Sequence, residues 1–220
     1  MSGKPDELRR SCVDCAVTRC DNSGSTKPYP AFCQSERLRE DGGTEASLQQ
    51  YREDPENLRL AQVAASVESD GYKKWPRVRE TIVFAKRMGY HKIGIATCVA
   101  LIRESRTLAK MLRANGFEVY GIGCKAGGLE KDELGIPPEH QGPGPAACNP
   151  ILQAELLAEA GTEFNIVMGL CVGHDSLFYK HSQAPVTTLV VKDRVLIHNP
   201  VMALYTADGY YAHLMEPLED

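Results

Sequence analysis

The stretch Lys92-Ile-Gly-Ile-Ala-Thr-Cys98 is a short apolar run that ends in a cysteine, and this pattern recurs along the second half of the chain. Three further apolar runs occupy residues 117–124, 165–171 and 185–191. Segments with helical periodicity lie between the runs, and their ends carry helix signals: Asn115-Gly116 is a typical stop and Asn149-Pro150 a typical start. Apolar strands that alternate with helices predict an α/β fold with a mostly parallel, helix-covered sheet.

Composition divides the chain into three predicted parts. Residues 1–44 are poor in aliphatic residues and rich in Cys, Ser, Gly, Pro and charge, so this module is expected to need a bound metal in order to fold. Residues 45–89 are predicted as a helical bridge, with helices that begin at Asp54-Pro55 and at Pro76. Residues 90–220 are predicted as the α/β domain, with flavodoxin- or Rossmann-like layers and a long Gly- and Pro-rich loop at residues 125–147.

Overall charge and hydropathy argue against several classes of protein. The 220 residues carry a formal charge of −4, which gives no basic surface for extended binding of nucleic acid. No apolar stretch is long enough to span a bilayer, and the first residues lack the apolar core of a secretory signal. We therefore expect a cytoplasmic protein without nucleic-acid or membrane partners. In that reducing compartment, clustered cysteines are more often metal ligands or redox groups than disulfides.

The first of two cysteine groups lies near the N-terminus. Cys12, Cys15, Cys20 and Cys33 form a C-x2-C-x4-C-x12-C array, and a C-x2-C pair can reach one metal ion from a tight turn. The intervals fit a single site with four sulfur ligands but match neither common ferredoxin spacing. Zinc and a second iron–sulfur cluster are therefore both open here. Four unliganded thiols on a polar segment are the least expected alternative.

The second group is dispersed in sequence but is predicted to converge in space. Cys98, Cys124 and Cys171 end three of the apolar runs, and Cys148 directly precedes the helix start at Asn149. Ligands of open parallel sheets bind beyond the carboxyl ends of the strands, so these four thiols are predicted to hold an iron–sulfur cluster, most plausibly [4Fe-4S]. The alternative is that they are small core residues, because free cysteine is among the most buried residue types.

Two neighbouring residues are candidates for catalysis. If only three cysteines bind the cluster, an open iron could bind and polarise a substrate. His174 lies three residues after Cys171 and is the candidate acid or base, whereas Lys125 is the candidate contact for a small anionic substrate. An electron donor is the other expected partner. Two competing hypotheses are a zinc-binding interaction or regulatory protein without catalysis and a redox-sensing dithiol switch.

Several stretches of the chain resemble a known family. They are GLCVGHDSLFYKHSQAPVTTLVVKDRVLIHNPVMALY (residues 169–205), IGIATC ending at Cys98, GIGCKAGG around Cys124, CNPILQAELL from Cys148, and the N-terminal cysteine array. The sequence resembles an uncharacterised bacterial and archaeal family whose members are mainly described as metal-binding proteins of unknown function. The resemblance implies that both cysteine groups bind metal. It implies no substrate.

Overall fold

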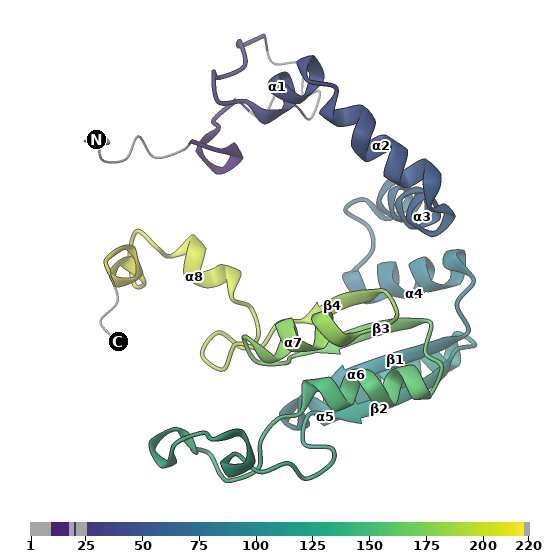
Figure 1. The fold of residues 1–220 in the computed structure, drawn as a ribbon, viewed down its shortest axis with the longest axis vertical. Coiled ribbons are helices and arrows are strands. Elements are labelled where there is room, and N and C mark those ends of the chain that lie inside the picture. Colours follow the sequence, from purple (N-terminus) through teal and green to yellow (C-terminus); the bar gives the residue numbers. More distant parts are fainter. Residues whose placement is uncertain (1–9, 18–19, 21–25, 218–220) are drawn as a thin grey trace. The chain divides into compact units, whose positions relative to one another are not determined.

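A computed structural model describes residues 10–17, 20 and 26–217 of the chain (Figure 1). The chain forms two compact units, Met1–Gln62 and Val63–Asp220. Their boundary falls inside helix α3 (Pro55–Gly71). The division into a metal module, a helical bridge and an α/β domain stays a prediction.

The described part of the first unit is helical. It contains the 3-10 turn η1 (Cys12–Asp14), α1 (Gln34–Glu40), α2 (Gly43–Glu53) and the first turns of α3. The side chain of Asp54 accepts hydrogen bonds from the backbone N–H groups of Glu56 (2.9 Å) and Asn57 (3.4 Å). This cap confirms the helix start predicted from Asp54-Pro55.

The second unit contains one sheet of four parallel strands. The strands are β1 (Lys92–Thr97), β2 (Glu118–Gly123), β3 (Phe164–Met168) and β4 (Val186–Val190), in the order β2-β1-β3-β4. The helices of this unit, after the end of α3, are α4 (Arg77–Met88), α5 (Ile102–Ala114), α6 (Pro150–Glu159), α7 (His174–His181) and the short α8 (Val201–Tyr205). The predicted α/β class with a helix-flanked parallel sheet is confirmed.

Local signals explain why these elements begin and end where they do. Gly89 ends α4 in the left-handed conformation at φ 82°, as its sequence position predicts. The side chain of Asn149 accepts the N–H of Leu152 at 3.0 Å and so caps α6. Residues 125–147 contain only two 3-10 turns, η4 (Asp132–Leu134) and η5 (Pro138–His140), and one isolated bridge, which confirms the predicted long loop.

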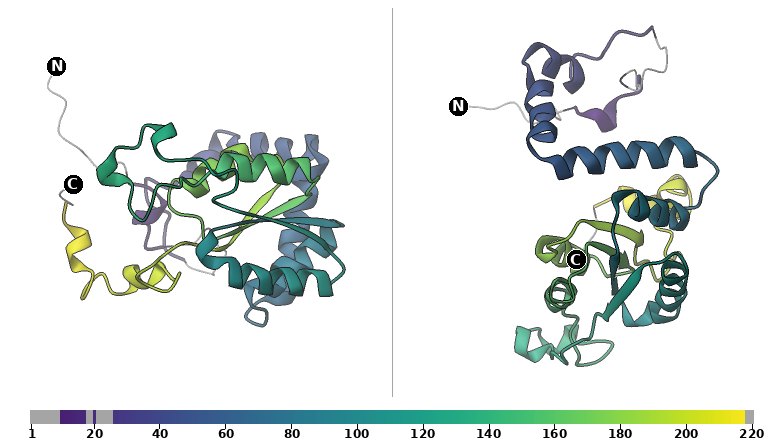
Figure 2. Two further views of the ribbon diagram at one scale, coloured as in Figure 1. Left: turned by 90° about the horizontal axis from the view of Figure 1, so that it is seen from below. Right: turned by 90° about the vertical axis from the view of Figure 1, so that its right-hand side faces the viewer.

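Helices cover both faces of the sheet (Figure 2). On one face, α4 and α5 pack Ala85, Leu108 and Leu112 against a core that includes Ile93 and Ile95 of β1. On the opposite face, residues of α6 and α7, among them Leu157 and Phe178, form a second core with strand residues such as Ala96 and Val167. Because successive side chains of a strand point to opposite faces, strands covered on both sides are apolar throughout. The central strands β1 and β3 are accordingly buried almost throughout, whereas β4 is half-buried and β2 is partly exposed.

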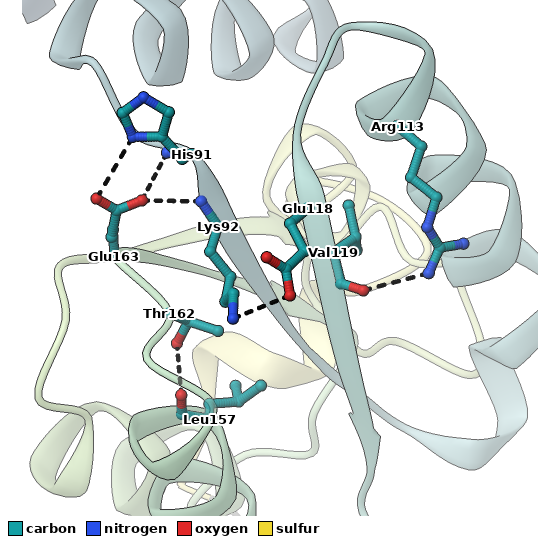
Figure 3. Close-up of polar contacts among 8 residues, drawn as sticks. All are labelled: His91, Lys92, Arg113, Glu118, Val119, Leu157, Thr162 and Glu163. Atoms are coloured by element: carbon teal, nitrogen blue, oxygen red, sulfur yellow. Dashed lines mark hydrogen bonds and ion pairs between the residues drawn. The ribbon is translucent and has the colours of Figure 1, made fainter.

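The amino end of the sheet is fixed by one carboxylate (Figure 3). Glu163, just before β3, accepts hydrogen bonds from the backbone N–H groups of His91 (2.5 Å) and Lys92 (2.8 Å). Its own N–H donates to the carbonyl of Lys92 at 2.9 Å. These bonds lower the pKa of Glu163 below its ordinary value, because the backbone donors favour the charged form. Glu163 thus joins the starts of β1 and β3.

Replacing Glu163 with glutamine should lower the free energy of unfolding by about 1 kcal/mol at neutral pH, because the charge-assisted hydrogen bonds are weakened. A depressed pKa contributes stability above the ordinary value of 4.5, and this contribution is lost as the pH falls through the lowered value. Urea unfolding of the original chain and of Glu163→Gln should therefore show that the difference in their free energies of unfolding shrinks as the pH falls into the acid range. Glu155→Gln, at an exposed carboxylate of α6, is the matched control; an equal effect there would contradict the assignment.

The topology creates a switch point, which opens a crevice at the carboxyl end of the sheet. The chain passes from β1 outward to β2, crosses back to β3, and continues outward to β4 on the other side. The order reverses between β1 and β3, and ligands of doubly wound sheets bind at such a point.

None of the helices in the described part of the chain is both long and apolar enough to cross a membrane.

One predicted strand end is wrong. The third apolar run was expected to continue as a strand to Cys171, but β3 ends at Met168. The cause is Gly169, whose φ of 66° turns the chain out of the strand. A Cβ atom there would also lie 2.1 Å from Leu101, so glycine is required for close packing as well. Cys171 consequently lies in the loop that leads into α7.

Candidate cysteine site

Cys98, Cys124, Cys148 and Cys171 all lie at the carboxyl end of the sheet, and we call them the cysteine site. Cys98 directly follows β1 and donates its N–H to Met168 at 3.1 Å. Cys124 directly follows β2 and donates its N–H to Thr97 at 2.8 Å. All eight cysteines of the chain have free thiols.

Cys148 and Cys171 come from the starts of two helices. Asn149 donates its N–H to the carbonyl of Cys124 at 2.8 Å, which brings Cys148 beside the end of β2. The carbonyl of Cys171 accepts the N–H groups of His174 (3.0 Å) and Asp175 (3.1 Å) and thereby starts α7. The predicted convergence from four separate segments is thus present in the backbone.

Three of the thiols interact directly. Cys124 lies between Cys98 and Cys148 and hydrogen-bonds to both sulfur atoms. This contact lowers the pKa of Cys98 to about 5 and that of Cys148 to about 5, against the opposing effect of burial. The same contacts raise the pKa of Cys124, because its proton is shared with two electron-rich neighbours. We therefore expect these three thiols to form a thiolate–thiol–thiolate group at neutral pH.

The metal-free protein should accordingly hold two thiolates in this group at neutral pH. The pKa values of Cys98 and Cys148 lie below the ordinary value of 9.0, so lowering the pH should protonate them only near pH 5. Ultraviolet absorbance of the thiolate during an anaerobic pH titration measures this directly. Cys98→Ser and Cys148→Ser should each remove part of the acid transition. A single transition near the ordinary pKa would contradict the assignment.

Cys171 has a different environment. Its sulfur accepts a hydrogen bond from Arg194 Nη2 at 3.1 Å, and it is half-buried rather than buried. The charge of Arg194 also reaches the thiols of Cys98 and Cys148. Arg194 therefore contacts one thiol of the site directly and acts through its charge on two others. Arg194 was not identified from the sequence as part of the site.

Lys192 is the second cation that sequence reasoning missed. Its side chain is only 8% exposed, and its ammonium group hydrogen-bonds to the Cys98 sulfur. A Cβ atom at Gly169 would make only ordinary contact with the Lys192 Cε, at 3.6 Å, so the lysine stem packs against this turn. A buried lysine is rare unless it is paired. The available signal was positional: Lys192 and Arg194 directly follow β4, at the carboxyl end of the sheet where ligands bind.

The two predicted catalytic candidates both lie at this site. His174 is the first residue of α7, and its charge when protonated would act on Cys148. Its Nδ1 atom is buried and has no hydrogen-bond partner among the described residues. Lys125 also lies near Cys148, but its ammonium group donates to the carbonyl of Ala146 and so ties together the two ends of the long loop. Lys125 therefore has a structural partner as well as a thiolate neighbour.

A buried glutamine lies beneath the same edge. Gln153 of α6 is fully buried and donates its Nε2 to the carbonyls of Thr97 (3.2 Å) and Ile122 (2.7 Å). These two carbonyl partners fix the orientation of the amide, because a flipped amide would set oxygen against oxygen. Its Oε1 consequently has no partner in the described part of the chain. The buried orphan atoms of Gln153 and His174 both belong to the surroundings of the cysteine site.

The N-terminal array is described at its four cysteines but not throughout. Cys15 donates its N–H to the carbonyl of Cys12 at 3.2 Å, which is the tight turn expected of a C-x2-C pair. Cys33 lies at the N-cap position of α1, and Cys20 is exposed. Residues 18–19 and 21–25 lie outside the described part of the chain. The metal site predicted here stays a prediction.

Neither cysteine group is a closed ligand shell. Within residues 10–17, 20 and 26–217, no three or more His, Cys, Asp or Glu side chains form a group that could hold a metal ion as they stand. The four backbone positions of the cysteine site nevertheless share one end of the sheet, and each cysteine side chain turns about a single bond. The donor set is therefore suited to a thiolate-ligated metal group, after side-chain rotation.

Comparison with known proteins gives a family but no activity. The family model described as "Protein of unknown function (DUF1847)" matches residues 33–189, a span that includes all four residues of the cysteine site. A protein of Methanocaldococcus jannaschii that is described as uncharacterised is 48% identical over 163 residues, which cover 74% of this chain and 83% of that protein. The expected similarity to an uncharacterised family with archaeal members is confirmed, whereas neither description mentions a metal. The chain therefore belongs to the DUF1847 family of proteins of unknown function.

Proposed function

We propose that this chain is an oxygen-sensitive iron–sulfur protein of the cytoplasm, in which Cys98, Cys124, Cys148 and Cys171 bind a [4Fe-4S] cluster. The observation that carries the proposal is the convergence of four thiols at the switch point of the sheet, three of them in direct contact. Cysteines that were merely core residues would not need two buried or half-buried thiolates. A metal group would take up these charges.

Charge balance supports the same proposal. A cubane cluster with four thiolates carries net negative charge, and such a charge is costly at a buried site unless cations lie near it. Lys192 and Arg194 provide two fixed positive charges that hydrogen-bond to sulfur atoms of the site. Hydrogen bonds to sulfur are also a means by which proteins set the reduction potential of a cluster.

The chain's own residues would have distinct roles in such a site. When bound, the cluster would supply one-electron chemistry or, at an iron not held by cysteine, a Lewis acid. Cys171 is the ligand most suited to leave, because its sulfur is already bound by Arg194. His174 would then be the candidate acid or base, and Lys125 the candidate contact for a small anionic substrate. An electron donor is the partner expected if the reaction is redox or sulfur-handling chemistry.

The N-terminal cysteines would form a second metal site of a different kind. Cys12, Cys15, Cys20 and Cys33 lie on a chain segment with little buried surface, and the observed turn from Cys12 to Cys15 suits zinc or a second cluster. Zinc at this site alone, with no iron elsewhere, would instead favour a zinc-binding interaction or regulatory protein without catalysis.

The deciding measurement is the content of iron, zinc and acid-labile sulfide per chain, on protein purified without oxygen. About four iron and four sulfide are expected for one [4Fe-4S] cluster, and about eight of each for two, because each cubane takes four cysteine ligands. About four iron with one zinc would divide the roles between the two cysteine groups. Zinc alone, without sulfide, would overturn the proposal. The four residues of the cysteine site would then be ordinary core residues.

A further inference from the structure

A groove of about 280 Å³ lies between α5 and the edge strand β2. Its apolar lining includes Val119 of β2, Ile102 and Ala109 of α5 and, at the bottom, the nearly fully buried Ile95 of β1. It opens on the face of the sheet covered by α4 and α5, whereas the side chains of Cys98 and Cys124 belong to the core on the other face. The groove is thus separate from the cysteine site.

The groove exists because β2 has a glycine where a side chain would fill it. Gly121 pairs with Ile95 in the parallel ladder and faces α5, like Val119 two residues earlier. A Cβ atom at Gly121 would make only ordinary contacts with Ile95, at 3.7 Å. The backbone therefore does not require glycine at this position for packing, and its absent side chain leaves open space.

The rim of the groove is strongly basic. Arg106, Lys110 and Arg113 also line it, and their spacing of four and three residues places them along one side of α5. None of the three forms a salt bridge with a carboxylate in the part of the chain that the structure describes. Arg113 donates one hydrogen bond, at 3.2 Å, to the carbonyl of Val119. The guanidinium group of Arg106 and the ammonium group of Lys110 are available to an anion.

The inner end of the groove offers no proton donor. Thr97 and Ser105 lie there, both buried, with their hydroxyl oxygens 2.6 Å apart. Thr97 Oγ1 donates to the carbonyl of Cys98 at 3.0 Å, so Ser105 must donate to Thr97. An anion would gain nothing at this end. A ligand would place its charge at the basic rim and its apolar part over the floor.

We propose that this groove binds a small amphipathic anion. The carboxylate or phosphate group of such a ligand is held by Arg106 and Lys110, and an apolar chain or ring of roughly ten non-hydrogen atoms lies over Ile95 and Val119. A groove of this volume is at the small end of ligand sites, which excludes a nucleotide-sized ligand. The proposal does not depend on what the cysteine site binds.

Isothermal titration of the full chain with octanoate tests the proposal, with butyrate, octylammonium and inorganic phosphate as comparison probes. Octanoate should bind more tightly than butyrate by at least about tenfold, because the longer chain buries more apolar surface. It should also bind at least about tenfold more tightly than octylammonium, whose charge the rim repels. Equal binding of octanoate and octylammonium would overturn the proposal, and binding of phosphate alone would show an ion site without an apolar part.

Variants locate the binding. Gly121→Val fills the groove and should weaken octanoate binding by at least about tenfold, as should the double variant Arg106→Gln, Lys110→Gln. Lys180→Gln on α7, on the other side of the sheet, is the control for loss of a positive charge elsewhere and should bind octanoate as the original chain does. If the Gly121→Val variant unfolds, Gly121→Ala replaces it as the test variant, because the structure tolerates a single Cβ atom at this position. Undiminished binding by folded Gly121→Val or Gly121→Ala together with the double variant would overturn the proposal.

Discussion

Replacing Cys124 with serine or with alanine should remove nearly all the iron and sulfide of the cysteine site from anaerobically purified protein. Cys124 is the central thiol of the group and is buried, so solvent has little access to take its place as a ligand. The visible absorption of the protein should disappear with the iron. The loss should be the same for both substitutions, because neither hydroxyl nor methyl replaces a thiolate in an iron–sulfur cluster.

The two substitutions separate the ligand hypothesis from the core hypothesis. If Cys124 were only a small core residue, alanine would be well tolerated, whereas serine would bury a hydroxyl group at a cost of about 1–3 kcal/mol. A core role thus predicts different stabilities and no change in metal content. Cys33→Ser in the N-terminal array is the matched control and should leave the cluster of the cysteine site intact. Full iron content in both Cys124 variants would disprove the proposed cluster.

Much of the fold could be predicted because its signals are local. Short apolar runs predict buried strands, and Asn149-Pro150, Asp54-Pro55 and Gly89 mark helix ends through contacts within a few residues. The cysteines could be assigned to one edge because the ends of parallel strands meet there whatever the strand order. The order β2-β1-β3-β4 depends on long-range packing, and single-sequence reasoning had no signal for it.

The chemistry around the thiols could not be predicted in the same way. The contact between Lys192 and Cys98 joins residues from the ends of different strands, and no local sequence pattern indicates it. The grouping of three thiols, with Cys171 held apart by Arg194, depends on where β3 ends. No sequence signal distinguishes Gln153, and only its burial against two strand carbonyls shows its role.

Replacing Lys192 with methionine should change the cysteine site more than any other substitution that leaves all four thiols in place. The ammonium group is buried and hydrogen-bonds to the Cys98 sulfur, so its loss leaves a buried thiolate without its cation. In the metal-free protein the pKa of Cys98 should rise. Breaking a buried pair by removing one partner typically costs about 3–5 kcal/mol, so unfolding should also become markedly easier at neutral pH.

In protein that holds the proposed cluster, Lys192→Met should lower the reduction potential by on the order of 100 mV. Unit charges about 4 Å apart interact by ~4 kcal/mol at an effective dielectric constant of ~20, and tenfold in a one-electron equilibrium corresponds to ~59 mV. Lys192→Arg keeps the positive charge and should restore most of both the potential and the thiolate pKa. Lys180→Met, on the exposed surface of α7, should change neither.

The two measurements on Lys192 variants test different steps of the argument. A raised Cys98 pKa in the metal-free protein depends only on the observed contact between the ammonium group and the sulfur. A lowered potential depends in addition on a redox-active metal group at these thiols. If Lys192→Met raises the pKa but the protein shows no reducible centre, the cation serves a reactive thiolate rather than a cluster, and the thiolate–thiol–thiolate group itself becomes the site of the chemistry.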